Sequence, residues 1–104
     1  MMNLTPHAIV VRTPAGDITY PPSGTIARVI TRDVPCDPIN GVPVIQRVMG
    51  DVTGLPAGDV PCLVSSMVLG AIPGRPNTFA PDTGNTAIRD TNGHIVAVTR
   101  FVAA

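Results

Sequence analysis

The chain has 104 residues, no net charge at pH 7, 44% hydrophobic residues and 13% charged residues. This length suits a single domain, residues 1–104, without room for separate catalytic and regulatory domains. Zero net charge argues against non-specific attraction to long nucleic acid or to an anionic membrane. Since the mean hydropathy is +0.31, a small monomer would leave apolar surface uncovered, and we expect a homo-oligomer.

The charged residues are of two kinds only, because every cation is Arg and every anion is Asp. One interpretation is a GC-rich genome, whose codons favour both residues. The other is physical, because a guanidinium is a planar fork that suits phosphate or carboxylate. The two interpretations are compatible.

Nothing in the sequence predicts secretion or membrane insertion. The start of the chain, Met1–His7, lacks a cationic segment followed by an apolar one. The mainly apolar run Val60–Ile72 is too short to span a bilayer. Cys36 and Cys62 are too far apart for a C-x-x-C motif, and we expect both to be free, small, buried hydrophobic residues of a cytoplasmic protein. The alternative, a single disulfide, would require a secretory context.

The first half of the chain predicts short strands, because 12 Pro and 10 Gly break the sequence into short segments. The first two strands are expected to pair as a hairpin. A loop is expected at Pro35–Gly41, because its prolines and the Asn40-Gly41 pair disfavour regular strand pairing. The predicted strands are Ala8–Arg12, Asp17–Tyr20, Thr25–Val34 and Pro43–Val52.

The second half predicts a short strand, a helix and a hairpin. Val60–Val64 suits a buried strand, and apolar residues at helical spacing follow it up to Ile72. The helix is expected to be capped by Ser65 or Ser66 and to end at Gly74.

Thr86–Arg89 and His94–Val102 flank a turn that contains Asn92-Gly93, which predicts the final hairpin. His94–Val102 is apolar on both faces, as in a central or interface strand. Together the elements predict an α+β domain that is mostly β: a small antiparallel sheet of about six short strands with one short helix packed on it.

A polar stretch from Gly74 to Thr86 is the most function-like segment, because a long loop in a small domain is usually functional or disordered. In one interpretation Asp82, Thr83 and Gly84 form a polar cradle, bordered by Arg75 and Arg89 as anion-binding forks. In the other, Pro81–Gly84 is only a structural turn.

Two further residues are candidates for the ligand site. His7 would lie at a pocket rim, although Asn3 and Thr5 around it also suit a simple strand entry. Arg28 would contribute a guanidinium from a predicted strand. No cofactor or metal is expected, because His7, His94 and the two cysteines show no ligand spacing.

Three sequence blocks resemble a family of small uncharacterised proteins of phages and prophages from GC-rich bacteria. The blocks are Asn3–His7, Pro22–Arg28 and Pro81–Gly84 with the following Ala87–Asp90. The resemblance implies a cytosolic protein made during infection and carries no assigned reaction. Asn85 stands where such relatives are expected to have a proline, which leaves the loop less rigid.

The first functional hypothesis is a non-enzymatic phage-type oligomer that binds a small anionic ligand and sequesters, for example, a cyclic-nucleotide immune signal. The alternative is a structural or host-protein-binding interaction module. A second alternative is a small hydrolase with Asp82, His7 or His94 as its base, although no nucleophile or phosphate-binding motif is present.

Overall fold

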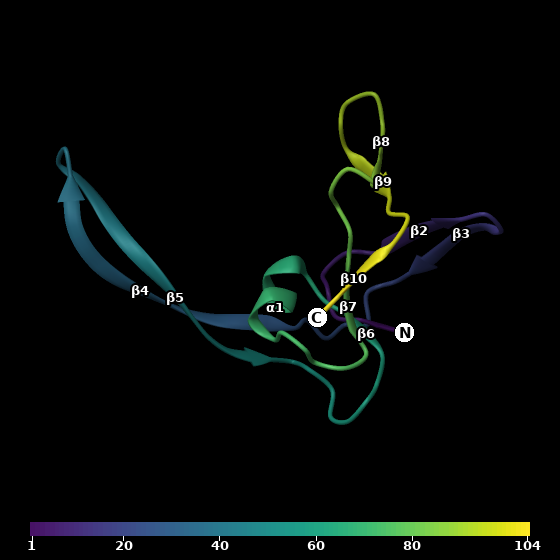
Figure 1. Cartoon of the computed structure of the whole chain (residues 1–104), viewed down its shortest axis with the longest axis horizontal. Coiled ribbons are helices and arrows are strands. Elements are labelled where there is room, and N and C mark those ends of the chain that lie inside the picture. Colours follow the sequence, from purple (N-terminus) through teal and green to yellow (C-terminus); the bar gives the residue numbers. More distant parts are fainter.

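The computed structural model describes all 104 residues and combines ten strands with one short helix (Figure 1). Strands hold 49% of the residues, so the expectation of a mostly-β α+β domain is confirmed. No helix has the length and apolar character needed to cross a membrane. The elements are β1 (Met2–Asn3), β2 (Ile9–Thr13), β3 (Gly16–Tyr20), β4 (Arg28–Ile39), β5 (Val42–Thr53), β6 (Cys62–Leu63), α1 (Ser66–Ala71), β7 (Thr78–Pro81), β8 (Ile88–Arg89), β9 (Ile95–Ala97) and β10 (Phe101–Ala103).

The strands form several small sheets, so the expected single antiparallel sheet of about six strands is wrong. The largest sheet has the order β1-β6-β7-β10, and the hairpins β2–β3, β4–β5 and β8–β9 are separate. Within the largest sheet only β7 and β10 are antiparallel. The pairs β1–β6 and β6–β7 are parallel. For β6 and β7 the cause is α1, which connects them and returns the chain to the same end of the sheet.

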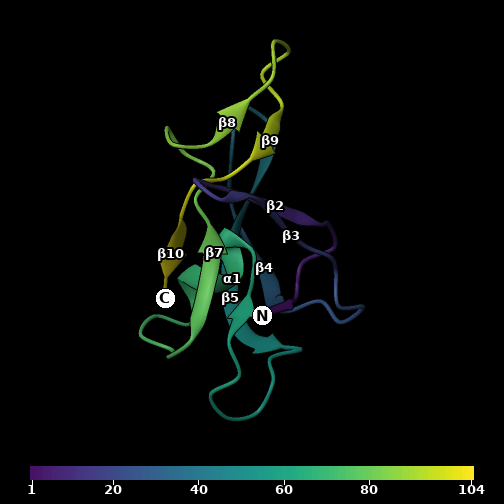
Figure 2. The same cartoon turned by 90° about the vertical axis from the view of Figure 1, so that its right-hand side faces the viewer.

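The molecule is extended, because its hairpins project from a small body (Figures 1 and 2). Its extents are 54 × 40 × 24 Å and its radius of gyration is 16.5 Å. A compact domain of this length has a radius of gyration of about 13 Å. The longest projection is the β4–β5 hairpin, residues 28–53, which we call the arm.

Two apolar clusters form the core of the body. The first lies between α1 and the largest sheet, and the second lies where β2 and Val98 meet the opposite side of β6. Val98 also connects the segment after β9 to β2 through the backbone, since its N–H donates to Val10 O at 2.8 Å. The first cluster comprises Leu4, Ala27, Cys62, Val64, Val68, Leu69 and Ala80. The second comprises Ile9, Val11, Leu63 and Val98. Cys62 is buried in the first cluster as expected, whereas Cys36 is exposed, so the expectation of a buried Cys36 is wrong. The cause is its position on the arm, where no second layer covers the two-stranded ribbon.

The helix begins as expected and ends earlier than expected. Ser65 is the N-cap, and its side chain accepts a hydrogen bond from Val68 N at 3.3 Å. The last helical residue is Ala71, so the prediction of an end at Gly74 is wrong. The cause is Pro73, because a proline disfavours helical backbone at the residue before it, here Ile72.

The expected loop Pro35–Gly41 is also wrong, because β4 continues to Ile39 and pairs with β5 along the whole arm. Asn40 (φ 50°) and Gly41 (φ 75°) form the two-residue turn, which is the conformation that Asn-Gly favours in hairpins. Pro35 pairs with Ile45. Because Pro35 has no N–H, its nitrogen faces away from β5, where an edge strand tolerates proline.

The predicted polar loop from Gly74 to Thr86 is interrupted by β7, an inner strand of the largest sheet. Thr78 and Ala80 on this strand are buried. The Thr78 hydroxyl donates to Pro76 O at 3.0 Å, so burial leaves it hydrogen-bonded. Polar composition therefore misidentified an inner strand as loop.

The final hairpin is confirmed in outline, and so is the first one. β8 pairs with β9 around the predicted turn. The Asp90 carboxylate accepts hydrogen bonds from Asn92 N and His94 N. The expected strand His94–Val102 is divided, because its last part forms β10 at the edge of the largest sheet. The edge position excludes the central strand that was one of the two expectations. Val102 is exposed there, and the other expectation, an interface strand, stays a prediction.

Candidate functional site

The Asp82 carboxylate organises the turn that follows β7. Its Oδ1 accepts a hydrogen bond from Gly84 N at 3.0 Å. Its Oδ2 accepts from Arg100 Nε at 2.7 Å and from Thr86 Oγ1 at 3.5 Å. The Arg100 guanidinium, and after it the Gly84 amide, hold the pKa of Asp82 below its ordinary value. Both oxygens are thus occupied by groups of the same chain.

The two arginines expected to border this turn lie in different places. Arg89 does reach it, because its Nη2 donates to Thr83 O at 3.4 Å while its Nη1 donates to Gly93 O at 2.7 Å. Arg75 precedes β7, whereas Asp82 follows that strand. The Arg75 Nη2 donates to Pro56 O at 2.7 Å, and this hydrogen bond ties the turn before β6 to the body.

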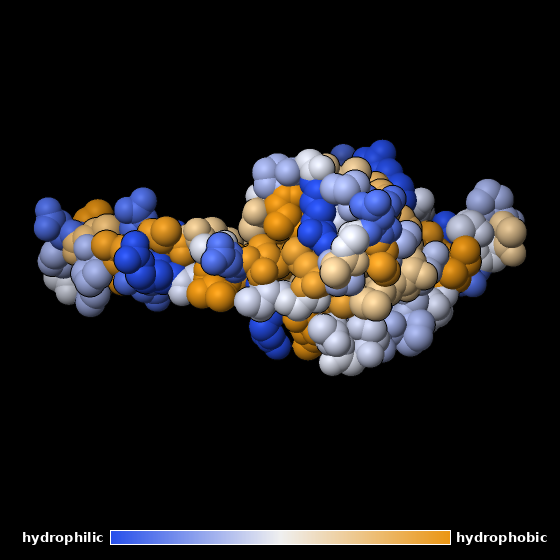
Figure 3. Space-filling view, turned by 90° about the horizontal axis from the view of Figure 1, so that it is seen from below, coloured by the Kyte–Doolittle hydropathy of each residue, from blue (hydrophilic) through white to orange (hydrophobic).

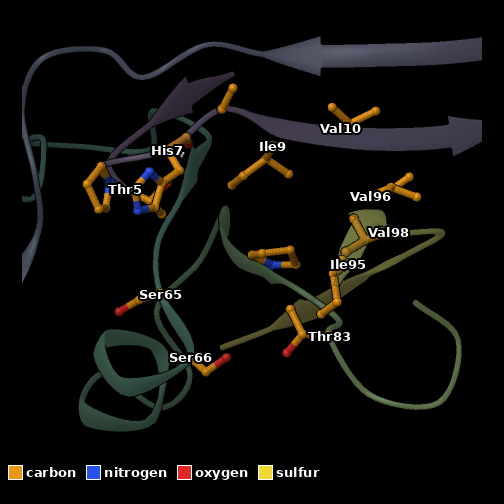
Figure 4. Close-up of a pocket in the computed structure, with 14 residues that line it drawn as sticks. Thr5, His7, Ile9, Val10, Ser65, Ser66, Thr83, Ile95, Val96 and Val98 are labelled. Carbon is orange, nitrogen blue, oxygen red and sulfur yellow. Dashed lines mark hydrogen bonds between the residues drawn. The ribbon is translucent and has the colours of Figure 1, made fainter. Parts of the chain in front are cut away.

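A groove of about 560 Å³ opens beside the Asp82 turn and between β2 and β9 (Figure 4). His7 and Thr83, two of the predicted site residues, line it. Its walls are mostly aliphatic, with hydroxyl groups of Thr5, Ser65 and Ser66 at one side. The lining residues are Thr5–Val10, Ser65, Ser66, Pro81, Thr83 and Ile95–Val98.

The chemistry of the groove favours an apolar guest. His7 is the single titratable side chain in its lining, and no Arg or Asp contributes to it. An anion would therefore find no guanidinium there. In Figure 4 the labelled side chains of Ile9, Val98 and Ile95 point toward the hollow from two sides.

Asn3 holds the segment that leads into the groove. Its side chain is 1% exposed and makes four hydrogen bonds. Nδ2 donates to His7 O at 2.8 Å and to Tyr20 O at 2.9 Å. Oδ1 accepts from the backbone and the hydroxyl of Thr5 at 2.9 and 2.7 Å. The predicted strand-entry role of Asn3 and Thr5 is thus present, and His7 also lines the groove.

Arg28 lies apart from the groove, at the base of the arm. It lines a smaller hollow of about 240 Å³ together with Thr5 and Ser65. Its guanidinium is exposed and makes no ion pair or hydrogen bond with the protein. Among the predicted anion-binding arginines, Arg28 is the one whose donors remain free.

The three candidate bases for hydrolysis lie in different surroundings. The Asp82 carboxylate already accepts hydrogen bonds from Arg100, Gly84 and Thr86. His94 Nδ1 lies 3.8 Å from Asp90 Oδ2 at an exposed turn. His7 lies in the groove. No three His, Cys or Asp side chains gather into a group that would hold a metal ion. The three candidate bases therefore do not come together in one place.

The arm is the feature that sequence reasoning missed. Side chains at directly paired positions share one face of a ribbon, so the register assigns each residue of the arm to a face. One face carries Arg32, Val34, Cys36, Val44, Gln46 and Val48. The other carries Thr31, Asp33, Pro35, Ile45, Arg47 and Met49. The Asn40-Gly41 pair was the available signal, because it favours a tight hairpin turn.

Comparison with known proteins gives no functional assignment for these features: no protein family, no curated protein and no solved structure matches the chain.

Proposed function

We propose that this protein is a non-enzymatic interaction module that assembles with further copies of itself through the arm. Both faces of the arm expose apolar side chains, Val48 on one face and Ile45 and Met49 on the other. Figure 3 shows hydrophobic residues along this projection, mixed with polar ones. An isolated two-stranded hairpin is marginally stable in water, and a partner that covers one face would stabilise it.

The total surface supports the same proposal. The chain exposes 6798 Å², whereas a compact monomer of its mass exposes about 5,500 Å². The excess of about 1,300 Å² is larger than the roughly 800 Å² that each partner buries in a stable interface. Backbone pairing is also sparse, with 42 hydrogen bonds where a domain of this length has about 70.

The proposal is tested by Ile45→Asp on the arm against Ile18→Asp on β3. Both isoleucines are 46% exposed and both lie in hairpin strands, so the monomer loses similar apolar surface in either variant. Native mass spectrometry and sedimentation velocity should show an oligomer for the unchanged chain and for Ile18→Asp, and a monomer for Ile45→Asp. Wild-type protein that stays at 10.8 kDa at tens of micromolar would exclude self-assembly.

A second candidate function is binding of a small anion, such as a phosphate or a cyclic nucleotide, beside Arg28. Its support is the free guanidinium at a hollow that also holds two hydroxyl-bearing residues. Arg75, Asp82, Thr83, Gly84 and Arg89 would act only as scaffold, since the side chains of both arginines and of Asp82 already bond within the chain.

Calorimetry with inorganic phosphate and a panel of cyclic nucleotides tests this candidate. Arg28→Ala should abolish the binding heat, and Arg12→Ala should preserve it because Arg12 is paired with Asp17. Equal loss in both variants would reject a site at Arg28. The resemblance to phage and prophage proteins adds the expectation of a cytoplasmic role during infection for either function.

A further inference from the structure

We propose that the tip of the arm, residues Pro38–Pro43, seats in the groove between β2 and β9 of a second copy of the chain. This inference rests on the proposed self-assembly and adds which surfaces meet. Its starting point is that one chain carries both an exposed apolar knob and an open apolar groove.

The knob is the tip of the arm. Ile39 and Val42 lie opposite each other and are 64% and 60% exposed. Prolines flank them on both sides, and the turn between them is Asn40-Gly41. No residue from Pro38 to Gln46 carries a charge, so the knob can enter an apolar site without burying an ion.

The groove has matching chemistry. Its lining contains no Asp or Arg, and its rim exposes Ile95 and Val96. Its volume of about 560 Å³ lies within the range of about 300–1,000 Å³ that accommodates a compact guest. A charged segment would gain no partner here, whereas the aliphatic knob would cover Ile95 and Val96.

A chain cannot fill its own groove in this way. The arm leaves the body beside α1 and points away from it (Figure 1). Each of its strands has 12 residues, which places the tip about 40 Å from the base at roughly 3.3 Å per residue. The knob therefore meets the groove of another molecule.

The edges of the arm favour contact through side chains over addition of a strand. Pro35 on β4 turns its nitrogen toward open solvent and offers no N–H there. Pro43 belongs to β5 and removes a further donor. Prolines on edge strands impede pairing with another sheet, which leaves the knob and the two faces as contact surfaces.

A second copy is the occupant that the observations favour. The Arg and Asp residues of the arm balance, with three of each in residues 28–53, so the arm offers no net charge to a nucleic acid or to a strongly charged protein. The excess surface described above exceeds what one stable interface buries on each partner, and each copy would divide this area between its knob and its groove. Since each copy has one knob and one groove, successive contacts form a pair that exchanges arms, a closed ring or an open filament, depending on the rotation between copies.

The test uses one variant on each side of the contact, both in the full chain. Ile39→Asp changes the knob, and Val96→Asp changes the rim of the groove. Each alone should lose the oligomer in native mass spectrometry. Mixed together they should form a 1:1 complex, because the intact groove of the first accepts the intact knob of the second. Ile18→Asp should keep the wild-type mass.

The outcomes separate this inference from the proposed function. If the wild-type chain is monomeric, both fail. If Ile39→Asp is monomeric while Val96→Asp remains oligomeric, self-assembly stands and the groove is not its partner surface. Ala8→Arg, which fills the groove from its exposed side, is a second groove variant and should also dissociate the oligomer. Circular dichroism melts should show that all variants fold. A folded mixture without the 1:1 complex overturns the inference.

Discussion

Arg100 Nε lies 2.7 Å from Asp82 Oδ2, and this ion pair connects the turn after β7 to the segment that enters β10. The same carboxylate accepts the Gly84 amide. The Asp82 side chain thus holds both the turn that carries Thr83 at the groove and the segment that leads to the edge strand β10.

The Asp82–Arg100 pair predicts a pH dependence of stability. Because the pKa of Asp82 is lower in the folded chain than its ordinary value, its stabilising effect is complete above about pH 4 and is lost as the pH falls below that value. Asp82→Asn should lower the melting temperature at pH 7, and the difference from wild type should shrink at pH 2.5. The Asp59 carboxylate accepts no hydrogen bond in the folded chain, so the control variant Asp59→Asn should melt like wild type. A constant difference at both pH values would contradict this assignment.

Asn3 predicts a large loss of stability on truncation. Asn3→Ala removes four hydrogen bonds in a buried position and should lower the free energy of unfolding by roughly 1–3 kcal/mol. Urea denaturation measures this change. Asn92→Ala, at an exposed turn, is the control and should change it far less. Similar losses in both variants would mean that Asn3 does not organise the N-terminal segment.

Gly54 predicts how the arm is attached to the body. Its φ is +85°, and an added Cβ would lie 2.5 Å from Ile26 O. Gly58 has a φ of +75° and open space around it. Gly58→Ala should therefore destabilise by about 1–2 kcal/mol through backbone strain alone, and Gly54→Ala should destabilise by more. Equal unfolding free energies for the two variants would show that the arm base has room to adjust.

The two thiols predict a labelling pattern. Cys36 is exposed on the arm and Cys62 is buried in the core. Ellman's reagent at low protein concentration should label one thiol per native chain and both after unfolding. Cys36→Ser should leave no fast thiol. As the concentration rises, self-assembly through the arm should slow the labelling of Cys36. A rate that does not depend on concentration while the chain is oligomeric would place Cys36 outside the interface.

Local signals predicted several elements of this fold. Asn92-Gly93 identified the final hairpin, and Ser65 identified the start of the helix. β-branched apolar residues identified β2, and the turn after it identified β3 as its hairpin partner. The arm was missed because Pro35 and Pro38 were interpreted as evidence against pairing. That rule holds for inner strands and fails on an open edge. β7 was missed because its segment is polar in sequence. A threonine such as Thr78 can nevertheless be buried, because its hydroxyl donates to the nearby Pro76 O.

The site was less accessible to sequence reasoning than the elements were. The groove combines residues from Thr5–Val10, from the start of α1 and from Ile95–Val98, and only the tertiary fold brings them together. The sequence predicts His7 and Thr83 as site residues because both are polar residues in segments that stand out from the apolar strands. The predicted cluster of arginines did not form, because Arg75 and Arg89 bond to carbonyl groups at separate turns.

Sedimentation velocity of the full chain across a concentration series, with wild type and Ile45→Asp side by side, tests self-assembly through the arm most directly. We predict that wild type sediments as a species of two or more times 10.8 kDa and that Ile45→Asp sediments as a folded monomer. A wild-type chain that remains monomeric at every concentration, or an Ile45→Asp variant with the wild-type mass, would contradict the proposed role of the arm.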